Sequence, residues 1–328
     1  MTNEASDPTT SFTTAERARA VRWKRSSSAL PDSAREPAPF RGRGGTVQGS
    51  FPFCLPLEHA ELNLLPEVRA VALELFEELG IPWHPAGDRP SNHLLSSQVQ
   101  CVNALGAMVT DPDRIVLCFR PILGTSEVEA IEPGRFLTFE YIGPTDYFGE
   151  VPGGGRVRGS MCTSVDAAFV HRTTHGVREL VLIEWKYTEH YPPRRQEPAK
   201  DETRRHRYEP FLTGTDSPVR SDVLPFDAFL QEPLYQLMRQ QLLAHELQRQ
   251  RVLDVDSVRV VHMCPRANDR YQQSLGMEPY TAVGATTSDV WAAILATPDR
   301  FVSVDNGVFL DPSVTSAEYV DRYGGDVS

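Results

Sequence analysis

Apolar positions between residues 55 and 124 repeat with the period of an amphipathic helix. Residues 66–80 carry apolar side chains three or four apart, with proline first and glycine last, which predicts a helix. The same spacing predicts a second helix over residues 92–109. Residues 111–124 fit either a helix or a strand, and their Asp111-Pro112 start favours a helix.

Beyond residue 134 the apolar period changes to two, which is typical of strands. Residues 135–143 alternate apolar and polar side chains and are predicted to form a strand. Two further strands are predicted at 163–173 and 178–189, and the His175-Gly176 pair between them indicates a hairpin.

The rest of the chain adds a long insertion, two helices and a strand. Residues 188–226 are a polar insertion, followed by an amphipathic helix over 233–251. Residues 257–265 read as a strand and 287–302 as a late helix. This order predicts one α/β domain over residues 51–328, in which helices flank a mixed β-sheet.

Residues 1–50 show no apolar period and are rich in Ser, Thr, Pro, Arg, Gly and Ala. Such a composition predicts a disordered leader. Within it, the basic segment 17–25 fits a solvated tail, with an arm for DNA or a protein partner as the alternative.

Composition narrows the classes of protein. With 40% hydrophobic and 23% charged residues the chain can bury a sizeable core, and its net charge of −11 disfavours general nucleic-acid adhesion. The five scattered cysteines form no CxxC pair, which argues against disulfides and a zinc ribbon. No apolar window approaches the ~20 residues that cross a bilayer, and no secretory signal is evident. We therefore expect a cytoplasmic protein with no membrane partner.

The strand at 178–189 carries charge where more core residues would be expected. Because side chains alternate along a strand, Glu184 and Lys186 share one face at the end of an apolar run. Asp166 interrupts the neighbouring strand, and pairing through the hairpin would bring it close to Glu184. Buried charges are costly unless they pair or bind a ligand, so this convergence indicates a site.

Two adjacent carboxylates repel each other, and a hard divalent cation such as Mg²⁺ relieves that repulsion. A bound cation lowers the pKa of water, while a neighbouring lysine offsets charge on a phosphate. Asp166, Glu184 and Lys186 therefore suit phosphodiester hydrolysis. The structural alternative is a simple salt bridge from Lys186 at the margin of the sheet.

The order Asp166, then Glu184-Trp185-Lys186, then a helix and a strand resembles the PD-(D/E)XK nuclease superfamily. The flanking segment 164–191 is similar to uncharacterised bacterial restriction-endonuclease-like proteins of that superfamily. The resemblance implies a restriction-endonuclease-like core over residues 92–265. One departure is Val165, which stands where the proline that names the motif is expected.

The resemblance also implies roles for individual residues. Asp166 and Glu184 would bind Mg²⁺, with Mn²⁺ as a substitute and the Trp185 carbonyl as a third ligand. Lys186 would be the catalytic lysine. Glu140 is the candidate for an additional acid, and an exposed strand glutamate is the alternative for it.

Polar side chains on the helix at 233–251 are further candidates. Gln236, Arg239 and Gln240 share one helical face, which fits either an approach to the metal and phosphate or a solvated surface. Ser97 and Gln98 are expected to approach from the second helix.

The insertion at 188–226 contains a basic run, which fits either a polar surface loop or a phosphate-contacting element. The candidate phosphate contacts are Arg194, Arg195, Arg204, Arg205 and Arg207. His171 and His175 lie in the hairpin, where no zinc geometry follows, and are expected at the surface.

The leading hypothesis is a Mg²⁺-dependent DNA endonuclease in restriction or phage defence, and double-strand cleavage would favour a homodimer. The alternative is a non-catalytic nucleic-acid-binding or assembly module on the same fold. A hydrolase with Asp166 and Glu184 as paired acid and base ranks last, because Lys186 would lower the pKa of the acid.

Overall fold

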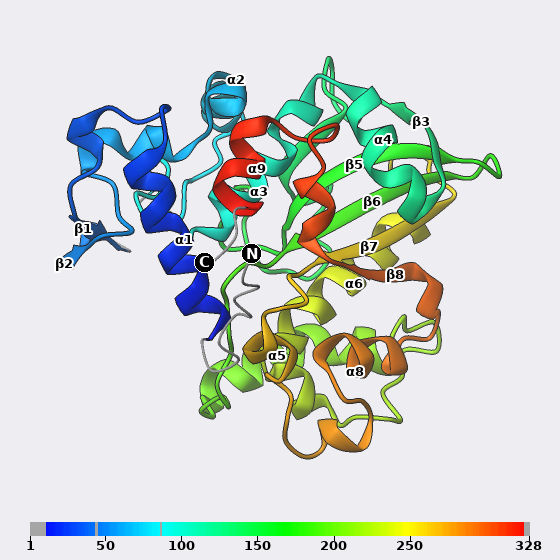
Figure 1. The fold of residues 1–328 in the computed structure, drawn as a ribbon. Helices are drawn as coiled ribbons and strands as arrows, with labels where there is room; N and C mark the ends of the chain where they lie inside the picture. The colour runs from blue at the N-terminus through cyan, green and yellow to red at the C-terminus, as the bar shows by residue number, and fades with distance from the viewer. Residues whose placement is uncertain (1–10, 43–44, 86, 325–328) are drawn as a thin grey trace, which may run out of the picture.

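The computed structural model describes residues 11–42, 45–85 and 87–324, and its centre is a mixed β-sheet (Figure 1). The sheet order is β3-β5-β6-β7-β8, and β4 also pairs with β5. Strands β3 to β6 pair antiparallel, whereas β6, β7 and β8 run parallel. The strands are β3 Thr125–Glu129, β4 Leu137–Tyr141, β5 Val165–Thr173, β6 Arg178–Trp185, β7 Ser257–Met263 and β8 Phe301–Val304.

Helices cover both faces of this sheet and create two cores (Figure 1). Alternate residues of β6 supply the two cores, with Val181 and Ile183 in one and Leu180 and Leu182 in the other. The first core is closed by α2 Pro66–Glu78, α3 Ser97–Leu105 and α4 Pro112–Leu123. The second is closed by α5 Pro198–Thr213, α6 Leu234–Arg249 and α8 Thr287–Ile294. The predicted α/β fold with a mixed sheet flanked by helices is confirmed.

Local signals explain the helices that the sequence predicted. Helix α4 begins where the Asp111 side chain accepts a hydrogen bond from the Arg114 amide, at 3.3 Å, with Pro112 in its first turn. It ends at Gly124, whose φ of 66° lies in the left-handed region. The helix interpretation of residues 111–124 is therefore confirmed. Helix α3 starts at Ser97, after the Ser96 cap, rather than at residue 92.

The described part of the predicted disordered leader is folded, so that prediction is wrong there. It forms α1 Phe12–Ser26 and a hairpin of β1 Ala38–Arg41 with β2 Val47–Phe51. Several of the side chains that α1 buries are polar, so the sequence of this helix shows no apolar period. Lys24 is only 1% exposed, and its ammonium donates to the carbonyls of Glu36 at 2.6 Å and Cys54 at 2.5 Å. Residues 1–10 lie outside the described residues.

Three other expectations need correction. The insertion at 188–226 contains helix α5, and the predicted helix over 287–302 ends at Ile294 before strand β8. Strand β3 was not predicted. His171 is fully buried, because β5 pairs on both sides, and its ring lies 3.3 Å from Glu179; His175 is exposed as expected.

Short helices make most of the remaining connections. They are Asp32–Ala34, Leu57–Asn63, Gly106–Val109, Phe226–Leu230, Val252–Asp254, α7 Asp269–Gln272, Tyr280–Ala282, Pro298–Arg300, Asn306–Leu310 and α9 Ala317–Gly324. Helix α9 lies beside α1, which brings the two ends of the described chain together (Figure 1). Across the described ranges, no helix has the length and apolar character to span a membrane.

The folded N-terminal segment predicts a large effect of Trp23→Ala. Trp23 is 3% exposed and packs beneath the Arg322 guanidinium, 4.5 Å from the ring centroid. Truncation should lower the free energy of unfolding by about 3 kcal/mol or more, measured by chemical denaturation. Arg25→Ala, at an exposed position of the same helix, should change it by less than about 1 kcal/mol. Equal stability of the two variants would contradict a docked α1.

Candidate functional site

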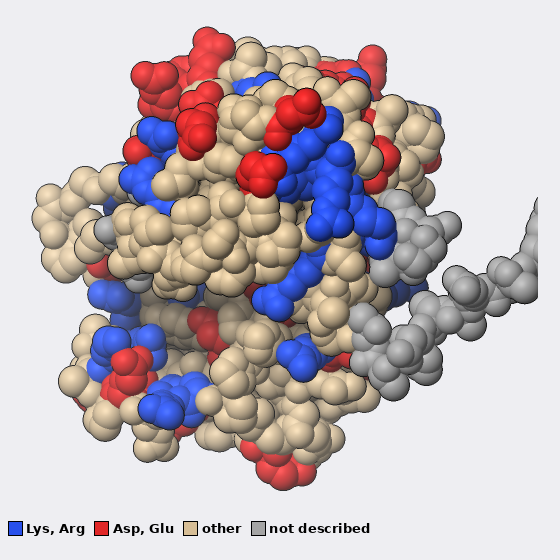
Figure 2. All heavy atoms as spheres, turned by 60° about the vertical axis from the view of Figure 1, so that its left-hand side comes forward, with Lys and Arg blue, Asp and Glu red and all other residues tan. Residues whose placement is uncertain are grey.

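A cleft of about 800 Å³ lies where β5 begins and β6 ends. One side is formed by these strands and α6, and the other by residues from α1, the β1–β2 hairpin and the segment before α3. Figure 2 shows a hollow on the face that carries the hairpin, with acidic atoms inside it and Lys and Arg side chains around it. The cleft therefore joins elements that are far apart in the sequence.

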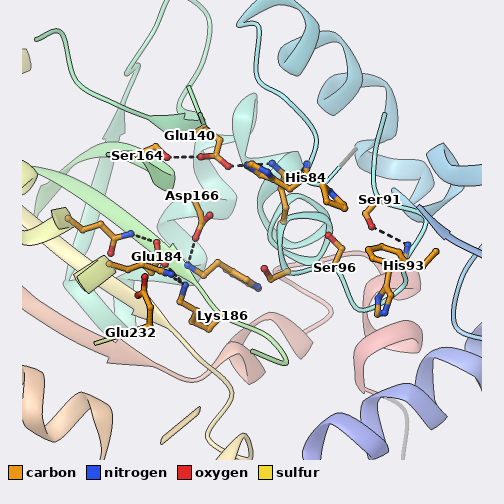
Figure 3. Close-up of a pocket in the computed structure, with 18 of the residues that line it drawn as sticks. His84, Ser91, His93, Ser96, Glu140, Ser164, Asp166, Glu184, Lys186 and Glu232 are labelled. Carbon is orange, nitrogen blue, oxygen red and sulfur yellow. Dashed lines mark hydrogen bonds and ion pairs between the residues drawn. The ribbon is translucent and has the colours of Figure 1, made fainter. Parts of the chain in front are cut away.

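The two predicted acids meet in this cleft. Ala167 pairs with Ile183 across the hairpin, so continuation of the same register places Asp166 opposite Glu184. The Asp166 carboxylate accepts a hydrogen bond of 2.6 Å from the Trp185 amide, directly after Glu184. Both carboxylates line the cleft, as Figure 3 shows.

Lys186 follows the last residue of β6 and is held in a defined position. Its ammonium donates to Glu184 Oε1 and to Gln236 Oε1, each at 2.5 Å. Its own amide donates to the Met263 carbonyl at 2.8 Å, and its carbonyl accepts from Asn306 at 2.7 Å. Although it lines the cleft, Lys186 is only 5% exposed, so its charge sits in a largely dehydrated place.

The three candidates of α6 also line the cleft rather than a solvated surface. The Gln240 amide donates to Glu184 Oε2, and Gln236 accepts from Lys186. Arg239 is turned to Glu150, at 3.1 Å, and to the Thr163 hydroxyl, at 3.0 Å. Two glutamines therefore hold the acid and the lysine, while the arginine has a carboxylate partner of its own.

Glu140 is buried at 6% exposure, in contrast to the alternative of an exposed strand glutamate. Its carboxylate accepts hydrogen bonds from Ser164 at 2.9 Å and from Gln98 at 3.4 Å. Its φ of 48° lies in the left-handed region, which is uncommon for a residue with a side chain and recurs at functional sites. Ser97 and Gln98 both line the cleft, as expected for the second helix.

The backbone rather than the indole of Trp185 belongs to the site. The indole Nε1 donates to the Gln100 side chain at 3.0 Å, and the ring lies in the core on the α3 side. Its backbone, by contrast, is bonded to Asp166 in the cleft.

The charges of the site are unbalanced. Burial, followed by repulsion from Glu184 and Glu140, raises the pKa of Asp166 well above its ordinary value, and Lys186 offsets this only in part. Burial is also the main cause that raises the pKa of Glu140 to about 7. Although burial disfavours its charge, attraction to Glu184 raises the pKa of Lys186, which stays protonated. Three acids thus share one ammonium, an arrangement that favours binding of a further cation.

The donors present suit Mg²⁺, which takes one or two carboxylates and completes its octahedron with water and phosphate oxygens. Asp166, Glu184 and the adjacent backbone supply that set. Within the described ranges, no cluster of three or more His, Cys, Asp or Glu side chains is arranged to bind a metal ion.

Glu232 and several aromatic residues also line the cleft and were not predicted from the sequence. One Glu232 carboxylate oxygen has no hydrogen-bond partner within the described residues, and burial raises its pKa. Glu232 precedes the Pro233 that opens α6, and no pattern distinguishes it. The aromatic run Phe51-Pro52-Phe53 was the one sequence pattern that could have indicated the side of the cleft opposite the acids.

The arginines of the insertion lie away from the cleft, since none of them lines it. Arg194 and Arg204 pair with Asp201, and Arg205 pairs with Glu209 and Asp227. Arg207 donates to the Gly149 carbonyl at 3.3 Å, and Arg195 is exposed.

Comparison with known proteins identifies the family of the chain. Residues 17–324 match the family model described as Restriction Endonuclease associating with ARP. The chain belongs to this restriction endonuclease family. Membership indicates a nuclease-related function and an interaction with DNA, and the match begins within α1. Neither the curated proteins nor the solved structures contain a match.

The raised pKa of Glu140 predicts how this family member responds to pH without metal. The folded state binds the Glu140 proton more tightly than the unfolded state between the ordinary pKa and about 7. Stability should therefore rise by about 1 kcal/mol, or about 2 °C in Tm, from about pH 8 to about pH 6. Thermal unfolding in chelator measures this rise. Glu140→Gln should remove this part of the rise, while Asp166, whose pKa is also raised, keeps its own contribution. An unchanged slope would contradict the assignment.

Proposed function

We propose that the protein is a Mg²⁺-dependent DNA endonuclease that hydrolyses phosphodiester bonds in restriction or phage defence. The observation that carries this proposal is the convergence of Asp166, Glu184 and Lys186 in one cleft. Family membership supports a nuclease, and the excess of carboxylates supports a metal-dependent one.

Asp166 and Glu184, with the Trp185 carbonyl, would hold Mg²⁺, and Mn²⁺ would substitute. The bound metal supplies a Lewis acid for the phosphate and lowers the pKa of an attacking water. The protein's part is to hold the two carboxylates in place, and a bound cation would favour their ionised form. The Trp185 amide fixes Asp166, and Gln240 and Lys186 fix the two oxygens of Glu184.

Lys186 would stabilise the charge that develops on the scissile phosphate. Gln236 holds the ammonium next to Glu184, so the lysine need not be reorganised when the phosphate arrives. Because Lys186 is 5% exposed, the field of its ammonium is weakly screened by water. Glu140 and Glu232 add negative charge at the margin of the site, which favours retention of the cation.

Lys186→Ala should lower the rate of Mg²⁺-dependent DNA cleavage by at least about 100-fold, because a preorganised positive charge is lost. Cleavage of a labelled single strand and nicking of a supercoiled plasmid measure the rate. Lys200→Ala is the matched control, since Lys200 also pairs with a glutamate, Glu197, but lies exposed on α5. Cleavage by Lys186→Ala at the wild-type rate would overturn the catalytic role. Wild-type binding of DNA without any cleavage in Mg²⁺ would favour the non-catalytic alternative.

Metal binding has its own prediction, independent of cleavage. Mg²⁺ at about one hundred times its Kd should stabilise the wild-type protein by about 2.7 kcal/mol relative to chelator. Asp166→Asn should abolish this gain, although it stabilises the metal-free protein by removing repulsion. Glu127→Gln, at an exposed position of β3, should keep the gain. Thermal unfolding with and without Mg²⁺ measures all three, and full stabilisation of Asp166→Asn would contradict the ligand assignment.

A further inference from the structure

The wall of the cleft opposite the acids is aromatic. Phe40, Phe51, Phe53 and His93, here called the aromatic wall, line the same cleft as Asp166, Glu184 and Lys186. Figure 3 shows His93 across the cavity from the two acids and the lysine. Each of the four rings is only partly buried, so each leaves surface exposed to the cleft.

The rings of the aromatic wall form one continuous cluster. Phe51 and Phe53 are stacked with centroids 5.3 Å apart and planes 19° apart. His93 contacts Phe53 at 5.0 Å and Phe40 at 5.3 Å between centroids. Arg17 of α1 lies over Phe53, 5.2 Å from the centroid, and also lines the cleft. Flat rings with a guanidinium beside them are the surface on which nucleobases stack.

The wall is anchored rather than loosely attached. The Asn92 side chain donates to the carbonyls of Pro39 at 2.8 Å and Leu55 at 2.7 Å, and it accepts from the Arg41 amide at 3.2 Å. One buried amide therefore ties the β1–β2 hairpin to the body of the domain. A fixed wall loses little entropy when a ligand binds.

Few cations line the cleft itself, in contrast to the Lys and Arg side chains around it (Figure 2). Proteins that hold duplex DNA neutralise many phosphates with Lys and Arg. The lysine and arginine side chains that line this cleft are Arg17, Lys186 and Arg239. Of these, Lys186 pairs with Glu184 and Arg239 with Glu150. Burial, together with Arg17, lowers the pKa of His93 to about 4, so its ring is neutral at neutral pH. Stacking is therefore the stronger source of affinity available in the cleft.

We propose that the aromatic wall stacks an unpaired nucleobase and that the substrate strand enters the cleft as single-stranded DNA. This inference rests on the proposed nuclease function and names its substrate class. Stacking on one wall would lay the adjoining phosphate towards Asp166, Glu184 and Lys186 on the other. A cleft of about 800 Å³ lies in the size range of pockets that enclose a small ligand, which fits a nucleotide better than a duplex.

The test measures binding in chelator, where no cleavage occurs. Fluorescence anisotropy of a labelled thymidine 12-mer is compared with that of a 12-base-pair duplex. The single strand should bind at least about tenfold more tightly. Its affinity should depend weakly on salt, with a log–log slope of about −1.4 for about two phosphates. Duplex binding as tight as single-strand binding, or no single-strand binding, would overturn the proposal.

Variants of the wall separate stacking from folding. Phe51→Leu keeps apolar bulk but removes the ring, and should weaken single-strand binding by about 5- to 150-fold. Phe51→Tyr keeps the ring and should bind as the wild type does. Phe226→Ala is the matched control, because Arg205 lies over Phe226 at 4.8 Å but neither residue lines the cleft. Wild-type affinity of Phe51→Leu would overturn the aromatic role.

The outcomes also separate this proposal from the nuclease function. Ring-dependent binding by a protein that never cleaves would leave the aromatic wall in place and remove the nuclease. Cleavage that requires Lys186 but is unaffected by Phe51→Leu would support the nuclease function and remove the role of the aromatic wall.

Discussion

The hydrogen bond from the Trp185 amide to Asp166 joins two acidic strand ends at the point where the sheet stops. The positions of both acids and of the lysine depend on this junction between β5 and β6. The register of β5 with β6 sets Asp166 opposite Glu184, and the parallel pairing of β6 with β7 carries the chain one residue further to Lys186. A slip of one residue in that register would turn the side chains of one strand to its other face.

The sheet makes this arrangement possible by surrounding it with apolar layers. Two cores cover the faces of β6, so its charged end cannot turn away into solvent without uncovering one of them. The cost of dehydrating Glu184 and Lys186 is offset by their mutual contact and by two glutamines of α6. Removal of one partner from a buried pair of this kind typically costs about 3–5 kcal/mol. Without a metal ion, the burial and mutual repulsion of these acids therefore lower the free energy of unfolding.

Local patterns predicted the hairpin, the helices at 66–80 and 111–124, and the convergence of Asp166 with Glu184. They succeeded because strand alternation and a tight turn determine which side chains meet. They failed where buried contacts are polar: Glu16 and Lys24 pack inward, so α1 shows no apolar stripe. Strand β8 is only Phe301–Val304 and depends on β7 for its pairing. Three of the insertion arginines, Arg194, Arg204 and Arg205, have carboxylate partners, which spacing along the chain could not identify.

The contact between α1 and α9 has a consequence for the order of events during synthesis. Trp23 packs beneath Arg322, and Glu16 accepts a hydrogen bond of 2.6 Å from Tyr187, the residue after Lys186. Helix α1 leaves the ribosome long before α9, so it cannot complete its native contacts until α9 has been made. The α1 side of the cleft lacks this support until then. A nascent chain that already holds both acids and the lysine therefore still has an open site, and the cleft matures late in translation.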